Sequence, residues 1–207
     1  MSLMKRAVLL VPLAAYFLCA APACSSDSPA TPRVLLQSNL GAGNQQGVND
    51  STVCSFSARD PWVTIGDPTN SASVADGDTD GNTGQVVSVS CDVTPEGDGF
   101  HVQASAQLGS QGAVTVTGHF TNNTPAVSAD TPIQNISASF SRADTGSFTE
   151  STCTVTYTTN PQFMGVAAGR VWADIDCPTA TYSSQNKTCE GTASFKFENC
   201  GGASTSN

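Results

Sequence analysis

Charge is scarce in this chain, and positive charge is scarcest. Only 12% of the 207 residues are charged, and 8 Lys+Arg stand against 17 Asp+Glu, for a formal net charge of -9. An acidic surface of this kind repels nucleic acid and anionic lipid headgroups. We therefore expect no nucleic-acid partner.

The chain also has little continuous apolar sequence. The one long apolar run, 7–21, follows Lys5 and Arg6 and precedes the small residues Ala21-Pro22-Ala23. A helix of that length reaches only about 22 Å, short of the roughly 30 Å hydrocarbon core of a membrane. A basic start, a short apolar core and small residues before a cut predict a signal peptide at 1–23. Its removal takes away Lys5 and Arg6 and leaves a net charge of -11.

Motifs for catalysis and for metal clusters are absent from the sequence. It has no G-x-S-x-G elbow, no H-E-x-x-H helix and no glycine-rich phosphate loop with a lysine. It has no C-x-x-C pair either, which disfavours structural zinc and iron–sulfur clusters. We predict a protein that is not an enzyme and requires no cofactor, with a hydrolase as the remote alternative.

Cysteine is the residue type that the chain does have. Of eight cysteines, Cys19 leaves with the signal peptide and Cys24 follows the expected cut. Six cysteines remain if Cys24 is modified, and an even number in an exported chain predicts a disulfide framework; an unmodified Cys24 would make seven and leave one free thiol. The members of the framework are Cys54, Cys91, Cys153, Cys177, Cys189 and Cys200.

Strand geometry restricts how these cysteines pair. An antiparallel meander is expected at 153–159, 170–177 and 190–199. A strand from Cys189 to Cys200 spans roughly 35 Å, whereas a disulfide needs Cα atoms within about 7 Å. We therefore predict Cys177–Cys189 as the preferred bridge, which leaves Cys200 to pair with Cys54 or Cys91.

The residues around Cys24 resemble those of bacterial lipoproteins. Ala21-Pro22-Ala23-Cys24 is similar to a lipobox, and Ser25-Ser26-Asp27 resembles the polar start of a lipoprotein tether. The resemblance implies a lipid on Cys24 that holds the protein to a membrane through a mostly disordered tether, 24–50. Since residue 25 is not aspartate, it also implies the outer membrane. An ordinary secretory cut at the same bond remains the alternative, with a secreted or periplasmic product.

The mature sequence alternates between apolar and polar residues, and no segment has a helical period. Alternation of this kind predicts strands with one buried face. The clearest runs are 85–93, 100–108, 114–120, 136–140, 153–157, 171–177 and 193–197. We predict an all-β fold over 51–201, a single antiparallel β-sandwich or open barrel of about eight or nine strands, followed by a disordered tail at 202–207. Within the tether, 34–40 is expected to add at most an edge strand.

Part of the C-terminal sequence shows a second resemblance. The segments 169–172, 177–178 and 191–200 are similar to the ending of small, uncharacterised, disulfide-bearing bacterial surface lipoproteins. This resemblance implies a class and a location but no activity.

An acidic loop is the first candidate binding site. Asp76, Asp78, Asp80 and Asn82 resemble the first half of an EF-hand loop, in which alternating oxygen ligands hold Ca²⁺. The twelfth position holds Val87 instead of the bidentate glutamate. Calcium therefore competes with a plain acidic surface loop as the interpretation.

A tryptophan with charged neighbours is the second candidate site. Alternation places Arg170, Trp172, Asp174 and Asp176 on the exposed face of one strand. There the indole ring could stack on a sugar while the carboxylates accept hydrogen bonds from its hydroxyls. The alternative is that Trp172 only packs against the sheet.

The two histidines are the last candidates. His101 and His119 are expected on the polar face of one hairpin, with His119 beside Gln103 and His101 diagonal to it. Two ligands make a poor metal site. The sequence as a whole predicts an envelope-anchored, non-catalytic binding or structural module, with a glycan or an envelope protein as partner. The alternative is a secreted carbohydrate-binding or calcium-stabilised adhesion domain, and the oligomeric state stays open.

Overall fold

The computed structural model describes residues 30–42, 54, 62–121, 127, 130–157 and 163–202. The predicted signal peptide, the lipidation candidate Cys24 and residues 203–207 of the predicted tail lie outside these ranges. Among the described residues, no helix is long and apolar enough to cross a membrane. The strands are β1 (Arg33–Gly41), β2 (Val63–Ile65), β3 (Val74–Ala75), β4 (Val87–Glu96), β5 (Gly99–Leu108), β6 (Gly112–Thr121), β7 (Ile133–Arg142), β8 (Gly146–Thr156), β9 (Gly165–Ala167), β10 (Arg170–Tyr182) and β11 (Lys187–Glu198).

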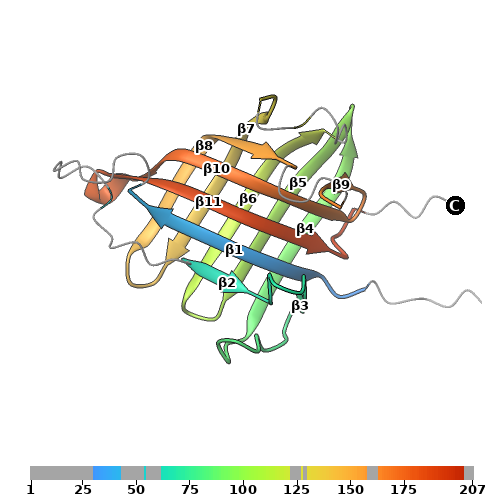
Figure 1. Cartoon of the computed structure of the whole chain (residues 1–207), viewed down its shortest axis with the longest axis horizontal. Coiled ribbons are helices and arrows are strands. Elements are labelled where there is room, and N and C mark those ends of the chain that lie inside the picture. Colours follow the sequence, from blue (N-terminus) through green and yellow to red (C-terminus); the bar gives the residue numbers. More distant parts are fainter. Residues whose placement is uncertain are drawn as a thin grey trace, which may run out of the picture.

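All of these strands belong to one antiparallel sheet that is nearly closed into a barrel. Its order is β2-β1-β11-β10-β8-β7-β6-β5-β4, with β3 added beside β1 and β9 beside β10. Figure 1 shows β1, β10 and β11 crossing in front of β4, β5 and β6. The all-β antiparallel prediction is confirmed, and the open-barrel form describes the arrangement.

The alternation that predicted the strands gives the barrel its inside and its outside. In β5 the side chains of Val102, Ala104, Ala106 and Leu108 are at most 1% exposed. The polar residues between them face outward because successive side chains of a strand point to opposite faces. Tight turns at Gly97 and Gly109, both with positive φ, connect β5 to its neighbours. Each strand therefore contributes an apolar row to the interior.

Aromatic side chains fill the interior between the two halves of the sheet. Phe140, Phe148, Phe195 and Phe197 are each at most 1% exposed. A side chain at Gly191 of β11 would place its Cβ 2.6 Å from Cε2 of Phe140 on β7. The ring of Phe140 thus reaches the opposite wall, where only glycine leaves room for it. Burial of one such ring stabilises the fold by about 1.5–3 kcal/mol.

The sheet begins earlier in the chain than the sequence predicted. Strand β1, residues Arg33–Gly41, lies inside the segment 24–50 that we expected to be mostly tether, and it pairs with β11 along its whole length. It is an interior strand and not an edge, because β2 and β3 pair with its other side. Leu35 on its outer face is 7% exposed and lies beside Gly66, which explains the apolar patch Val34-Leu35-Leu36.

Three disulfides cross-link the described sheet: Cys54–Cys189, Cys91–Cys200 and Cys153–Cys177. The pairing of Cys200 with Cys91 is one of the two that the sequence left open. Disulfides of this number indicate an extracellular or cell-envelope environment.

The predicted bridge Cys177–Cys189 is wrong. We took the residues between these cysteines as a loop, but β10 continues to Tyr182 and passes a bulge between Cys177 and Ala180. In this register Cys177 lies opposite Gly191 on β11, and its neighbour Asp176 pairs with Thr154 on β8. Cys153 of β8 is therefore the cysteine that Cys177 reaches.

A seam formed by two short segments covers the open edge of β4. At the start of β4, Gly77 donates its N–H to Val87 O (2.9 Å), and Val87 donates its own N–H to Asp78 O (2.8 Å). Further along the same edge of β4, Val93 donates its N–H to Gly201 O (3.0 Å), and Gly201 donates its N–H to Cys91 O (2.8 Å). The bridge Cys91–Cys200 fastens this second contact. The seam gives the exposed strand edge the hydrogen bonds that another strand would otherwise supply.

We predict that the seam disulfide contributes more stability than the bridge within the sheet. Cys91–Cys200 closes a separation of 109 residues, and Cys153–Cys177 one of 24 residues. The loop-entropy relation then gives about 4–5 kcal/mol for the first bridge and about 3 kcal/mol for the second. Chemical denaturation of the C91A/C200A and C153A/C177A variants measures both free energies of unfolding. Equal losses, or a larger loss for C153A/C177A, would contradict the prediction.

Candidate functional site

The outer surface of β1, β8, β10 and β11 carries a polar grid. The register places Gln37, Ser194, Asp174 and Thr156 in one row across these strands. The next row holds Asn39, Thr192, Asp176 and Thr154. Hydroxyl, amide and carboxylate groups from four strands therefore stand side by side. These eight residues form what we call the polar grid.

An aromatic pair lies at one end of the polar grid. Trp172 precedes Asp174 on the same face of β10, and Phe163 stacks on it with a centroid distance of 6.4 Å and an interplanar angle of 20°. The ammonium group of Lys196 lies 5.4 Å from the centroid of the indole ring. Phe163 is 64% exposed, which is unusual for a ring of this size. Exposed Phe163 and half-buried Trp172, which also packs against the core, form a pair that we call the aromatic platform.

Three hollows connect the aromatic platform with the polar grid. A hollow of about 330 Å³ lies over Phe163, Trp172 and Arg170, and one of about 320 Å³ lies on the other side of Trp172. A third, of about 430 Å³, lies over Asp174 and Asp176. Neighbouring hollows share lining residues: Trp172 and Lys196 join the first two, and Gln37 and Ser194 join the last two.

The four residues predicted as a ligand site therefore share one face. Arg170, Trp172, Asp174 and Asp176 follow β10 at every second position, over about 20 Å. Sequence reasoning missed Phe163, because it lies in the turn before β9 and no strand period leads to it. Only the pairing of β9 with β10, which sets Gly165 opposite Trp172, shows that the two rings meet.

Negative charge gathers at the far end of the polar grid. Partial loss of water, followed by the charges of Glu190 and Glu150, raises the pKa of Asp176. Glu150 is held in place because Thr179 donates to it from both its N–H (2.8 Å) and its hydroxyl (3.0 Å). Pro178, which has no N–H, lies in the bulge that turns Thr179 toward β8. This end of the grid is suited to a ligand that brings hydrogen-bond donors.

Glu150 also lies beside two sulfur atoms. Its carboxylate and the Sγ atoms of Cys153 and Cys177 lie within 4.8 Å of one another. Both sulfurs are joined in a disulfide. They are therefore not thiolates, the form in which cysteine binds metals.

The predicted calcium residues do not converge on a common centre. Asp80 is fully buried, and its Oδ1 accepts the N–H of Gly66 (2.8 Å). Its Oδ2 accepts the N–H groups of Asn82 (3.2 Å) and Thr83 (3.0 Å) and the Thr83 hydroxyl (2.9 Å). Asp76, which is exposed, accepts the N–H of Val89 (2.7 Å).

These carboxylates bind backbone groups of the seam. The Asn82 side chain donates from Nδ2 to Gly66 O (3.0 Å). Asp80 thus ties the residues after β2 to the loop that covers β4, and a cation would have to displace four donors to reach it. Asp78, the remaining candidate, is exposed.

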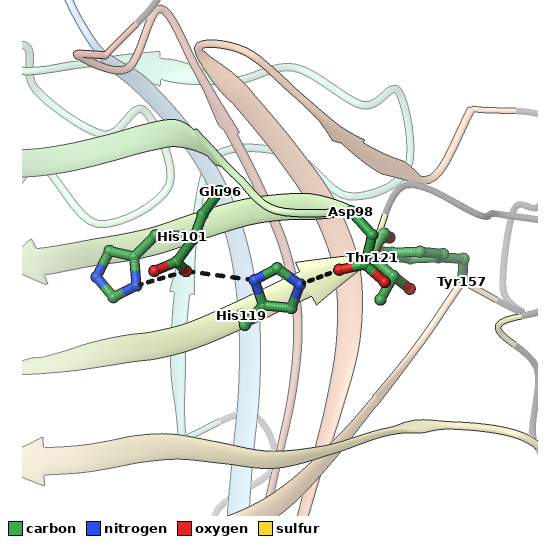
Figure 2. Close-up of polar contacts among 6 residues, drawn as sticks. All are labelled: Glu96, Asp98, His101, His119, Thr121 and Tyr157. Atoms are coloured by element: carbon green, nitrogen blue, oxygen red, sulfur yellow. Dashed lines mark hydrogen bonds and ion pairs between the residues drawn. The ribbon is translucent and has the colours of Figure 1, made fainter.

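The two histidines form a cluster with two carboxylates at the turn of the β4–β5 hairpin, next to the open end of the β5–β6 hairpin. His119 Nε2 lies 2.9 Å from Asp98 Oδ1, and His119 Nδ1 lies 3.3 Å from Glu96 Oε2. His101 Nδ1 lies 3.8 Å from the same Glu96 oxygen, so that Glu96 stands between the imidazoles (Figure 2). The side chains are 38–85% exposed, so this cluster is an open surface and not an enclosed cavity.

The predicted register of the histidines is wrong by two residues. His101 pairs directly with His119, and Gln103 pairs with Thr117, because the turn before β6 contains only residues 109–111. Behind the cluster, buried Tyr157 donates its hydroxyl to Thr121 O (3.1 Å), and burial raises the pKa of this phenol (Figure 2). Tyr157 thus anchors the end of β6 that carries His119.

Comparison with known proteins gives no relative: no family model, no curated protein and no solved structure matches this chain.

We predict that Asp80 is a structural residue of the seam. Asp80→Asn replaces one accepting oxygen by an NH₂ group that faces N–H donors, and unsatisfied buried groups of this kind cost about 2–3 kcal/mol. The matched control Asp78→Asn changes an exposed residue of the same loop, where about 0.5 kcal/mol or less is expected. Chemical denaturation with and without Ca²⁺ provides the measurement. A calcium-dependent gain in stability that D80N abolishes would show instead that the loop is a calcium site.

Proposed function

We propose that this protein is an exported, envelope-anchored, non-catalytic binding module that takes a glycan on the outer face of β1, β10 and β11. The observation that carries the proposal is the aromatic platform of Phe163 and Trp172 at the end of the polar grid. Binding sites typically combine apolar and aromatic surface with a few placed polar groups. A sugar ring presents the complement, with an apolar face of C–H groups and a rim of hydroxyls.

Two parts of the surface would contact the glycan: the aromatic platform and the carboxylates of the polar grid. Phe163, 64% exposed, offers an aromatic face on which one sugar ring can stack. Asp174 and Asp176, two and four residues beyond Trp172 on the same face of β10, accept hydrogen bonds from the hydroxyls of the next units. The three connected hollows give a chain of several sugars a continuous path.

Charge selects the kind of glycan. Asp174, Asp176 and Glu190 are acidic, and Arg170 and Lys196 lie at the aromatic end. Lys196 is already paired with Glu198 at 2.9 Å. An anionic polymer would meet repulsion at the polar grid, so the proposed ligand is a neutral or amino-bearing oligosaccharide.

We expect neutral oligosaccharides to bind the purified module and to change its tryptophan fluorescence. Trp62 is only 4% exposed, so Trp172 is the tryptophan that a surface ligand can reach. Phe163→Ala and Asp174→Asn should each weaken binding by about ten-fold, since loss of one aromatic or charged contact costs about 1–2 kcal/mol. Titration against a panel of neutral, amino-bearing and anionic glycans measures the affinities.

Gln103→Ala provides the matched control. Gln103 is an exposed polar residue on β5, in the other half of the sheet, and its removal should leave the affinity unchanged. A thermal melt of each variant checks that the fold is retained. Failure of every neutral or amino-bearing glycan to bind, or wild-type affinity in both F163A and D174N, would overturn the glycan proposal.

The anchoring part of the proposal is supported by the leader 1–23, the resemblance around Cys24 to a lipobox and the environment that three disulfides indicate. Cys24 precedes Arg33, the first residue of β1, by only nine positions. That length spans at most about 30 Å. A lipid on Cys24 would therefore hold the end of the barrel that carries Arg33, Glu198 and Arg170 close to the membrane.

We expect the intact mass of the exported protein to exceed that of residues 24–207 by a lipid group and to show six oxidised cysteines. Cys24→Ser should remove the added mass and move the protein from the membrane fraction to the soluble fraction. A wild-type mass equal to the unmodified polypeptide would identify a secreted or periplasmic protein. That result would leave the glycan proposal standing, because the two parts rest on different residues.

A further inference from the structure

Four ionisable side chains meet on the outer surface at the turn between β4 and β5, beside the C-terminal end of β6. Glu96 and Asp98 flank Gly97, the positive-φ residue of the β4–β5 turn. His101 and His119 are direct cross-strand partners on β5 and β6. Side chains so paired have Cβ atoms about 4.5–5.5 Å apart, close enough to share one ion.

We propose that this cluster is a site for a divalent transition metal, with Zn²⁺ as the ion, held by Glu96, His101 and His119. Imidazole and carboxylate groups are ligands that zinc takes in proteins, at about 2.0–2.2 Å. Three protein ligands leave a fourth position for water. The site lies on β4, β5 and β6, so it does not depend on the glycan face of β1, β10 and β11.

The donor spacing of one ligand pair fits the ion as it stands, and the other spacings require a side-chain movement. Two ligands of a tetrahedral zinc with bonds of about 2.0–2.1 Å are separated by about 3.3–3.4 Å. His119 Nδ1 and Glu96 Oε2 are 3.3 Å apart, and His101 Nδ1 and the same oxygen are 3.8 Å apart. The first pair already has the separation of two zinc ligands, and the second is wider by about half an ångström. The Nδ1 atoms of His101 and His119 lie more than 4.8 Å apart, so His101, whose side chain is 45% exposed, has to rotate toward His119 before the three ligands share one ion.

Asp98 positions one of the ligands. Its Oδ1 lies 2.9 Å from His119 Nε2, so Nε2–H donates to the carboxylate, and Nδ1, which is on the Glu96 side of the ring, is the nitrogen left to bind zinc (Figure 2). A metal-binding histidine commonly donates its second ring N–H to a carboxylate in this way, which fixes the tautomer and makes the imidazole a better ligand. Asp98 is thus a positioning residue, and Glu96, His101 and His119 are the ligands.

The test uses tag-free protein labelled with ¹⁵N-histidine and titrated with ZnCl₂. The chain contains two histidines, His101 and His119, so every imidazole signal reports on this cluster. We expect both imidazoles to shift and calorimetry to show one zinc per chain. CaCl₂ is the matched metal control, because calcium takes oxygen ligands and should leave the imidazole signals in place.

Four variants assign the roles of the residues. His101→Ala, His119→Ala and Glu96→Gln should each weaken zinc binding at least ten-fold. Asp98→Asn should weaken it by about ten-fold and also change the ratio of the two His119 tautomers seen in the ¹⁵N spectrum without metal. Gln103→Ala, one pair further along the same face, is the matched control and should bind zinc like the wild type.

Three results would overturn the proposal. The first is the absence of any zinc-dependent shift in the imidazole signals, which would leave the cluster as an ion-pair network. The second is zinc heat that persists in the H101A/H119A variant, which would place the metal elsewhere. The third is wild-type zinc affinity in both single variants, E96Q and H101A, which would show that Glu96 and His101 do not act as joint ligands. Each variant changes an exposed side chain, and a thermal melt confirms that the barrel is retained.

Discussion

Closure of a single sheet is the constraint on which the rest of this structure depends. An open antiparallel sheet has two edges whose backbone groups need partners. Here the loop after β3 and Gly201 both supply hydrogen bonds to β4, and Cys91–Cys200 fastens the second contact. The bent sheet brings its apolar face together, with Phe140 against Gly191 across the interior. Most of the opposite face of the sheet stays accessible, and both candidate sites lie on that outer face.

The alternation of residue types was sufficient to predict most of the strands, because burial on one face imposes a period of two. It failed at β1, where Leu35 is covered on the outer face as well and the period disappears into a short apolar run. It also failed at the Cys177–Cys189 bridge. Pairing depends on register, and the bulge at Pro178 shifts the register of β10 against β11 in a way that no local pattern reveals.

The candidate sites show the same division between local and long-range information. Trp172, Asp174 and Asp176 share a face through strand period alone, so the sequence predicted their grouping. Phe163 joins them only because β9 folds back on β10. The sequence predicted Asp80 as a surface ligand in a glycine-rich loop. In the structure it is buried and accepts a hydrogen bond from Gly66, which lies 14 residues earlier in the chain. Glu96 and Asp98 reach His119 because a turn of three residues sets the register of β5 and β6.

The pairing of β1 with β11 has a consequence for how the protein is made. On one side β1 pairs with β2 and β3, which follow it early in the chain, but its partner on the other side, β11, lies among the last residues of the barrel, and Cys91 likewise pairs with Cys200. A chain that emerges from its N-terminus therefore leaves the β11 side of β1 unpaired until the C-terminal strand has been made. Folds dominated by such distant contacts form slowly. The barrel can close, and the Cys91–Cys200 bridge can form, only after the C-terminal residues are present.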